Sequence, residues 1–210
     1  AKVSGWPDLV VRVGFAADMA SRNAERTKAA AKETSRNNIF PSDDFPDTSR
    51  DYYDDTSKTS FQATALACNQ LSDSQINLLE FSSEVKAPPT HYVVLDRTLF
   101  YPEGGGQLGD QGEIGNSRVV DTRIEGGVIF HLTDSEVSLG NVSGEVSWER
   151  RSQLMDHHTA VHIVGGSSRA LLGPHIWQAG SSKGFRYARI DLTHHSRPVS
   201  YTHLTLPTSD

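Results

Sequence analysis

Two histidines four residues apart carry the sharpest chemical signal in the sequence. His158 and His162 lie in a segment whose apolar residues recur with a helical period. Side chains at positions i and i+4 share one face of a helix, so both imidazoles can reach a single metal ion. Zinc normally takes four ligands, or three and a water molecule. The spacing therefore leaves open half of a zinc site or an incidental pair.

The other residues that could complete such a site are scattered. His194 and His195 follow a predicted strand and could approach the pair, but spacing alone does not show this. The only cysteine, Cys68, precedes the region of predicted strands. His157 points to another side of the helix and is expected in solvent.

Three consecutive glycines beside a glutamine form the second signal. Gly104, Gly105 and Gly106 precede Gln107 in the segment FYPEGGGQLGD. Glycine tolerates positive φ and allows another molecule to approach the backbone closely. The amide of Gln107 can both donate and accept hydrogen bonds. The Lys-Ser/Thr ending of a P-loop is missing, so the run predicts either another kind of binding loop or a plain hairpin turn.

A third polar group lies further along the chain. Gln178 precedes Ala-Gly-Ser, and Arg189 and Asp191 fall on one face of a predicted strand. Arg189 could pair with Asp191 or contact RNA. No Ser/His/Asp triad and no pair of catalytic acids can be read from the residues.

The elements that must position these groups change along the chain. Amphipathic helices are predicted within 7–36 and a polar loop at 37–60. Phe61 to Leu66 could begin a strand, and Ile76, Leu78 and Phe81 alternate as another. Further sets follow in order: short strands at 91–95, 112–114, 118–123, 128–132 and 144–148, a helix at 149–172, and a strand at 185–193. Short strands at this spacing suggest a small antiparallel barrel.

Composition and charge narrow the class. The chain has 210 residues, 36% of them hydrophobic, and no run of 18 apolar residues, which excludes a transmembrane helix. No signal peptide is visible, and one cysteine excludes a disulfide framework, so we expect a reducing cytoplasm.

The net charge of −6 argues against a generally basic nucleic-acid coat, but the charge is uneven. Residues 150–197 contain seven Lys and Arg residues but only two acidic residues. Six of the nine histidines also lie in this segment. Such a patch can attract a polyanion or can simply be a solvated face.

The three signals together, in this order, resemble a known family. Residues from about 91 to 195 are similar to the editing domain of the alanyl-tRNA synthetases. The similarity is carried by LDRTLFYPEGGGQLGDQG at 95–112, GEVSWERRSQLMDHHTAVH at 144–162, and GPHIWQAGSS and RIDLTHH within 173–195. The wording FYPEGGGQ is closer to archaeal than to bacterial members. Free-standing editing proteins share these motifs but usually lack a leader, so the resemblance favours the synthetase.

The resemblance implies a function and a set of site residues. The family hydrolyses the ester between a wrongly attached serine or glycine and the 3′ end of alanine tRNA. By resemblance, His158 and His162 are zinc ligands. The resemblance implies that the catalytic residues are Thr98, Gln107 and Gln178. It implies that the substrate-binding residues are Gly104, Gly105, Gly106, Asp110, Thr159 and Arg189.

The sequence departs from the family in three ways. Val161 stands where many bacterial members have Thr, so a pocket hydroxyl has to come from Thr98 or Thr159. The later Cys-and-His ligand motif does not occur, which leaves two of four expected zinc ligands. The segments that activate alanine with ATP are also missing, so we expect that ATP serves the intact parent only and that this chain alone does not charge tRNA.

We therefore expect an α+β fragment of alanine–tRNA ligase. Its predicted parts are a helical tRNA-recognition remnant at 1–50, a connecting segment at 51–87, an editing domain at 88–196 and a non-native tail at 197–210. Within the editing domain, the barrel is predicted at 88–148 and the histidine helix with its strands at 149–196. The expected partner is tRNA(Ala), bound through its aminoacylated 3′ end, with no membrane and no DNA. A free-standing deacylase and a tRNA-binding module with an inactive editing site remain as alternatives.

Overall fold

The computed structural model describes residues 38–194. The chain divides into two units at Ser42, and the barrel and the candidate site belong to the second, Asp43–Asp210. The predicted tail at 197–210 and most of the helical remnant at 1–50 lie outside the described residues. Helices and antiparallel strands are both present, which confirms the α+β class. Between residues 38 and 194, no helix is long and apolar enough to span a membrane.

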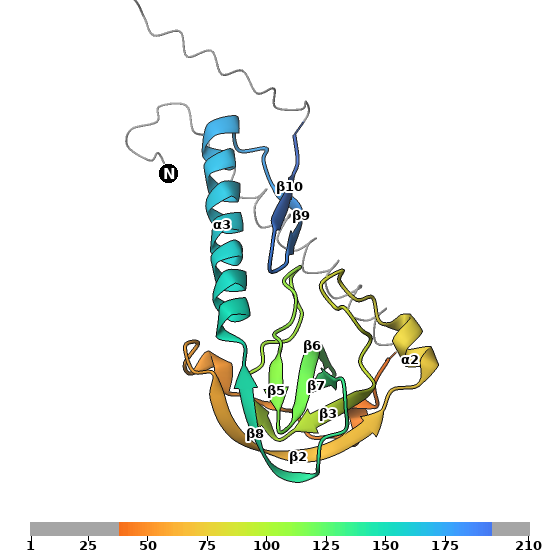
Figure 1. The fold of residues 1–210 in the computed structure, drawn as a ribbon. Helices are drawn as coiled ribbons and strands as arrows, with labels where there is room; N and C mark the ends of the chain where they lie inside the picture. Colours follow the sequence, from red (N-terminus) through yellow and green to blue (C-terminus); the bar gives the residue numbers. More distant parts are fainter. Residues whose placement is uncertain (1–37, 195–210) are drawn as a thin grey trace, which may run out of the picture. The chain divides into compact units, whose positions relative to one another are not determined.

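Six antiparallel strands of the described region close on one another (Figure 1). Their order is β2-β3-β7-β6-β5-β8, and β8 pairs back with β2 to complete a barrel. Closure leaves none of these strands with a free edge. Their bounds are β2 (Ser60–Gln70), β3 (His91–Leu95), β5 (Gly112–Ile114), β6 (Ser117–Glu125), β7 (Val128–Thr133) and β8 (Gly140–Val146).

The barrel interior is filled by apolar side chains from all sides. Phe61 and Phe100 meet edge to face, with ring centroids 6.0 Å apart. Gly144 faces Phe61 so closely that a Cβ at that position would lie 2.3 Å from the ring. The core cluster comprises Phe61, Ala63, Ala65, Val93, Leu95, Leu99, Phe100, Ile114, Val119, Val137, Val142 and Val146. Burying this surface supplies the main driving force for closing the barrel.

The barrel begins earlier in the chain than the sequence predicts. β2 pairs with both β3 and β8, so residues 60–70 belong to the barrel and not to a connecting segment at 51–87. The strand expected at 76–81 is also wrong, because α2 (Asp73–Leu78) occupies its first half and the structure has no strand over its second half. Ser72 and Gln75 form a capping box there, in which each side chain accepts a hydrogen bond from the other's backbone N–H. Those two bonds satisfy donors that a helix start otherwise leaves free.

Four short elements precede or flank the barrel strands. They are η1 (Ser42–Asp44), β1 (Ser49–Arg50), η2 (Asp51–Tyr53) and β4 (Arg97–Thr98). β1 and β4 pair in parallel, which places Arg50 beside Thr98.

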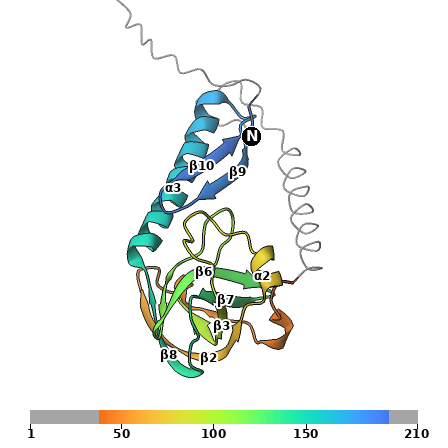
Figure 2. The same cartoon turned by 45° about the vertical axis from the view of Figure 1, so that its right-hand side comes forward.

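A long helix leaves the barrel directly after β8. α3 (Trp148–Leu172) covers the predicted helix at 149–172 and begins at Trp148, which the sequence had assigned to a strand. It ends at Gly173, whose φ of 114° suits glycine. A hairpin of β9 (Gln178–Lys183) and β10 (Ala188–Leu192) returns alongside α3 (Figures 1 and 2). The sequence predicts β10 but not β9, whose small and polar residues show no apolar alternation.

Candidate functional site

The triple-glycine loop lies between β4 and β5 and packs against β9. Gly105 and Gly106 have φ of 58° and 76°, and Gln107 N donates to Gly104 O at 2.9 Å to close the turn. A Cβ on Gly106 would lie 2.1 Å from the carbonyl oxygen of Ser181. Glycine is therefore needed at 106 both for its backbone conformation and for the close approach of β9.

Backbone hydrogen bonds align Gln107 with the end of β9. Lys183 N donates to Gly106 O at 2.7 Å, and Leu108 N donates to Lys183 O at 3.1 Å. Gln107 and Lys183 thus form a parallel bridge between the loop and the hairpin. The loop is a hairpin turn by its conformation, and this pairing also fixes it in place beside α3.

Gln107 and the histidine pair meet at one point on α3. Gln107 Oε1 lies 2.9 Å from His158 Nδ1, and His158 Nε2 lies 3.1 Å from His162 Nε2. An amide oxygen can only accept, so Nδ1 of His158 carries the proton that it donates to Gln107. In the neutral ring, Nε2 of His158 is then unprotonated and faces His162. Burial, followed by the charges of Lys183 and His162, lowers the pKa of His158 and favours this neutral ring.

Gln178 reaches the same region from β9. Its Nε2 donates to Ser181 Oγ at 3.1 Å. Gln178 and His162 also line one cavity of about 190 Å³ between α3 and the hairpin. The remaining lining residues of that cavity are Val161, Gly165, Gly166, Arg169, Ile176, Trp177 and Leu192.

Thr98 lies elsewhere, inside the barrel. Its side chain is fully buried, and Oγ1 is 2.8 Å from His131 Nε2 and accepts from Phe100 N at 3.0 Å. His131 Nδ1 donates to Val93 O at 3.1 Å, so Nε2 is free to accept the Thr98 hydroxyl proton. The structure brings Gln107, Gln178, His158 and His162 together but does not bring Thr98 to them.

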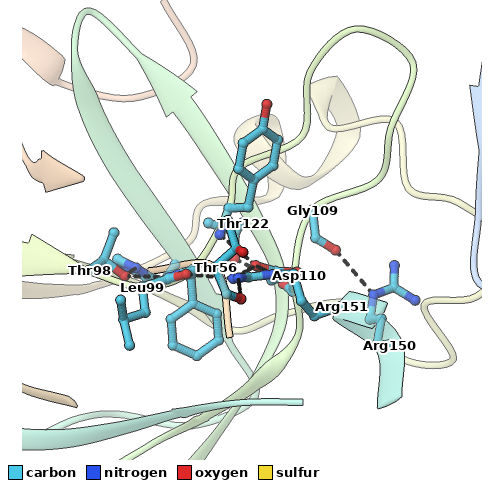
Figure 3. A network of polar contacts seen from close by, with 11 residues as sticks. Thr56, Thr98, Leu99, Gly109, Asp110, Thr122, Arg150 and Arg151 are labelled. Carbon is cyan, nitrogen blue, oxygen red and sulfur yellow. Dashed lines mark hydrogen bonds and ion pairs between the residues drawn. The ribbon is translucent and has the colours of Figure 1, made fainter. Parts of the chain in front are cut away.

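Asp110 joins the glycine loop to the first turn of α3 (Figure 3). Its carboxylate pairs with the Arg151 guanidinium and accepts from Tyr101 N at 2.6 Å. Arg151 also donates to Leu99 O at 2.6 Å, and the neighbouring Arg150 donates to Gly109 O at 3.1 Å. Asp110 is therefore fully engaged within the protein, and it orients the loop rather than facing a ligand.

Two further residues of the expected site bond to the chain itself. Thr159 Oγ1 donates to Met155 O at 3.0 Å, one turn back along α3. Arg189 pairs with Asp191 at 3.2 Å on the exposed face of β10, which was one of the two possibilities open from the sequence.

Much of the basic segment at 150–197 is neutralised or buried internally. Arg150 pairs with Glu84 at 2.7 Å, Arg151 pairs with Asp110, and Lys183 is buried. Arg169 lies 3.9 Å over the ring of Trp177. Over residues 150–194, which the structure describes, the segment consequently presents fewer free cations than its composition indicates.

Sequence reasoning misplaced His157 and missed Glu84. His157 is half-buried rather than solvated: Gln153 Nε2 donates to its Nε2, and its Nδ1 donates to Gly184 O at 2.7 Å. Glu84 accepts from Phe185 N at 2.7 Å while it pairs with Arg150. Both residues fix the turn of the β9–β10 hairpin. No local pattern marks these contacts, because the partners of His157 and Glu84 in the hairpin turn lie 27 and 101 positions away.

Two imidazole nitrogens are the metal donors that the described site offers. In a tetrahedral zinc site with Zn–N bonds of 2.0–2.1 Å, two ligating nitrogens lie about 3.3 Å apart. The 3.1 Å between the Nε2 atoms of His158 and His162 fits that spacing. A carbonyl-type oxygen on the far nitrogen, as Gln107 provides, is the usual support of a ligating histidine. Among residues 38–194, no group of three or more His, Cys, Asp or Glu side chains is arranged so that it could hold a metal ion. The ring of His194 contacts His175 at 2.8 Å.

Comparison with known proteins assigns the chain to a class. The family described as tRNA synthetases class II (A) matches residues 9–150, which is more than half of the chain. The chain therefore belongs to the class II tRNA synthetases of this type. The match includes the barrel and the glycine loop and ends at the first turn of α3.

The curated relatives that the chain is similar to are alanine–tRNA ligases. The chain is 39% identical to the alanine–tRNA ligase of Sulfurisphaera tokodaii over 165 residues, which are 75% of the chain and 16% of the relative. It is 50% identical to that of Metallosphaera sedula over 111 residues, or 50% of the chain and 12% of the relative. For Halorubrum lacusprofundi the identity is 37% over 179 residues, or 83% and 17%. The resemblance to the alanyl-tRNA synthetases is confirmed, and the chain spans about a sixth or less of these relatives.

Proposed function

We propose that this chain carries the editing site of an alanyl-tRNA synthetase. The site hydrolyses the ester that joins a wrongly attached serine or glycine to the 3′ end of alanine tRNA. One observation carries the proposal. Gln107 of the glycine loop contacts His158, His158 contacts His162, and His162 lines a cavity together with Gln178. Polar groups that converge beside a cavity in this way are typical of ligand sites.

Ester hydrolysis makes two demands on the site. Water adds to the acyl carbon, and the bond to the ribose oxygen breaks, giving free amino acid and tRNA. The site must orient the water and stabilise the charge that develops on the carbonyl oxygen. The unprotonated Nε2 of the neutral His158 ring can face the water, and the amides of Gln107 and Gln178 can donate to substrate oxygens. We assign no direct contact with substrate to Thr98 or Asp110, because both are engaged inside the protein.

Zinc is the metal that this pair would hold. When bound, zinc supplies a Lewis acid and makes a coordinated water more acidic. His158 and His162 would provide two ligands through Nε2, and Gln107 would keep the proton of His158 on Nδ1.

The chain's parent is proposed to be alanine–tRNA ligase, which joins alanine to tRNA(Ala) with ATP in the cytoplasm. The similarity to alanine–tRNA ligases supports this proposal. A free-standing editing protein is the alternative for the parent. Coding sequence upstream of Ala1 distinguishes the two, since a class II catalytic core there identifies the ligase.

Hydrolysis of Ser-tRNA(Ala) by the purified chain, with zinc supplied, tests the site. We expect release of serine above the uncatalysed rate, and Gln107→Ala to reduce the rate about a hundredfold, as for loss of a preorganised donor. Gln62→Ala is the matched control, because Gln62 is exposed on β2 of the barrel. Equal rates for all three proteins and buffer overturn the proposal. Tight tRNA binding without hydrolysis identifies the chain as a tRNA-binding module with an inactive site.

A further inference from the structure

Lys183 lies where the glycine loop, which carries Gln107, meets β9, which carries Gln178. It is the last residue of β9 and only 3% exposed. Its Nζ donates to Gly105 O at 2.8 Å and to Ser181 Oγ at 3.0 Å. Ser181 Oγ also accepts from Gln178 Nε2 at 3.1 Å. One side chain thus bonds to the glycine loop that precedes Gln107 and to the hydroxyl that holds Gln178.

The surroundings of this ammonium group are unusual for a buried lysine. In the described structure it is held by a backbone carbonyl and a hydroxyl, and burial lowers its pKa. Buried ammonium groups are costly unless their hydrogen bonds are satisfied. Removing the group therefore takes the side-chain donor from Gly105 O and leaves Ser181 Oγ with Gln178 alone as its side-chain donor, and both atoms belong to segments that carry a site residue.

We propose that Lys183 is a positioning residue that fixes Gln107 against His158 and Gln178 against Ser181. Its ammonium holds the turn at Gly105, and that turn sets where the Gln107 side chain begins. The Gln107 oxygen in turn selects the His158 ring form with its proton on Nδ1. The inference refines the proposed editing site, but it describes an arrangement of this chain's own atoms and can be tested without measuring hydrolysis.

The protonation pattern of the neutral His158 ring is the direct readout. Nitrogen-15 NMR of the histidine-labelled chain, about two pH units above the ordinary imidazole pKa, distinguishes a protonated Nδ1 from a protonated Nε2. The His158 signals are assigned by their loss in His158→Asn. We expect the wild-type ring to carry its proton on Nδ1. We expect Lys183→Met to give a mixture of both forms, with at least a tenfold loss of the preference for Nδ1.

Matched variants separate positioning from a general loss of structure. Lys86→Met, at an exposed lysine, should leave the ring unchanged. Lys183→Arg keeps a cation with N–H donors and should restore most of the preference for Nδ1. If Lys183→Met does not fold, as judged by circular dichroism, Lys183→Gln takes its place and is read by the same spectrum. A folded Lys183→Met or Lys183→Gln protein with an unchanged Nδ1 proton overturns the proposal, whatever the hydrolysis assay shows.

Discussion

The carboxylate of Asp110 and the guanidinium of Arg151 form a buried ion pair that joins the barrel to α3. Arg151 is 4% exposed and donates to the backbone at Leu99 and Thr56 as well as to Asp110. Asp110 lies three residues after Gln107, and Arg151 lies seven residues before His158. The pair therefore sets how the glycine loop and the histidine helix are held against each other.

Asp110→Asn should destabilise the fold strongly. The substitution keeps the size of the side chain but leaves the Arg151 charge buried without its partner, at a cost on the order of 3 kcal/mol. Urea unfolding followed by circular dichroism measures the loss. Asp191→Asn breaks the exposed pair with Arg189 and is the control, with an expected change of no more than about 1 kcal/mol. Equal effects of the two substitutions contradict a structural role for Asp110.

Adjacent glycines in the loop should respond differently to alanine. Gly105 and Gly106 both have positive φ, which costs a residue with a Cβ about 1–2 kcal/mol. Only Gly106 faces the backbone of Ser181, at 2.1 Å from an added Cβ, whereas nothing lies within 4 Å of one at Gly105. Gly106→Ala should separate the loop from β9, and hydrogen exchange at the Leu108 amide should then rise by tenfold or more. A Gly105→Ala protein with the same increase would show that strain alone is responsible.

His131 should make stability depend on pH. Burial lowers its pKa from the ordinary 6.5 to about 4, so the unfolded chain binds this proton at a higher pH than the folded chain does. The stability that the neutral ring confers is complete above pH 6.5 and is lost as the pH falls toward 4, by up to about 1.4 kcal/mol per pH unit.

Unfolding of the wild type and of His131→Gln at several pH values isolates this contribution. The stability advantage of the wild type should shrink as the pH falls from 6.5 toward 4. A difference that stays constant over this interval means that His131 does not govern the acid response.

Zinc should bind through the His158–His162 pair. We expect added zinc to shift the nitrogen-15 NMR signals of both imidazole rings. We expect His162→Gln to weaken zinc binding at least tenfold, since one of two ligands is lost. The chain offers a natural control in His175 and His194, whose ring nitrogens are 2.8 Å apart at the other end of the hairpin. Calorimetric titration of His175→Gln should resemble the wild type. Loss of binding in His175→Gln, with His162→Gln unaffected, would falsify the assignment and place the metal elsewhere.

Local patterns predict most of the elements around the site. Gly115-Asn116 and Gly126-Gly127 mark the turns between β5 and β6 and between β6 and β7, whereas Gly140-Asn141, which also predicts a turn, begins β8. The strands at 91–95 and 112–114 have the predicted bounds. The helix at 149–172 follows from its apolar period and from Gly173. Errors occur where a local bond overrides the pattern, as at the Ser72 capping box, or where a strand such as β9 is held by pairing rather than by apolar burial.

The site itself is only partly predictable. The spacing of His158 and His162 places them on one helix face, but nothing local places Gln107 beside them, 51 positions away. The resemblance to a family supplied that link. Neither route identified Lys183, although it is the only lysine between 150 and 197. Its importance follows from the depth of its burial and from the carbonyl it meets, which depend on how the hairpin packs.

The pairing of β2 with β8 constrains the order in which the molecule can assemble. Ser60 pairs with Glu145, so the first barrel strand to be synthesised must wait for the last before the ring is complete. Contacts between such distant positions slow folding, because a long loop must close first. α3 starts two residues after β8, and its Arg151 anchors to a loop of the finished barrel. During translation, α3 can therefore pack against the completed barrel only after the chain has been made well past residue 146.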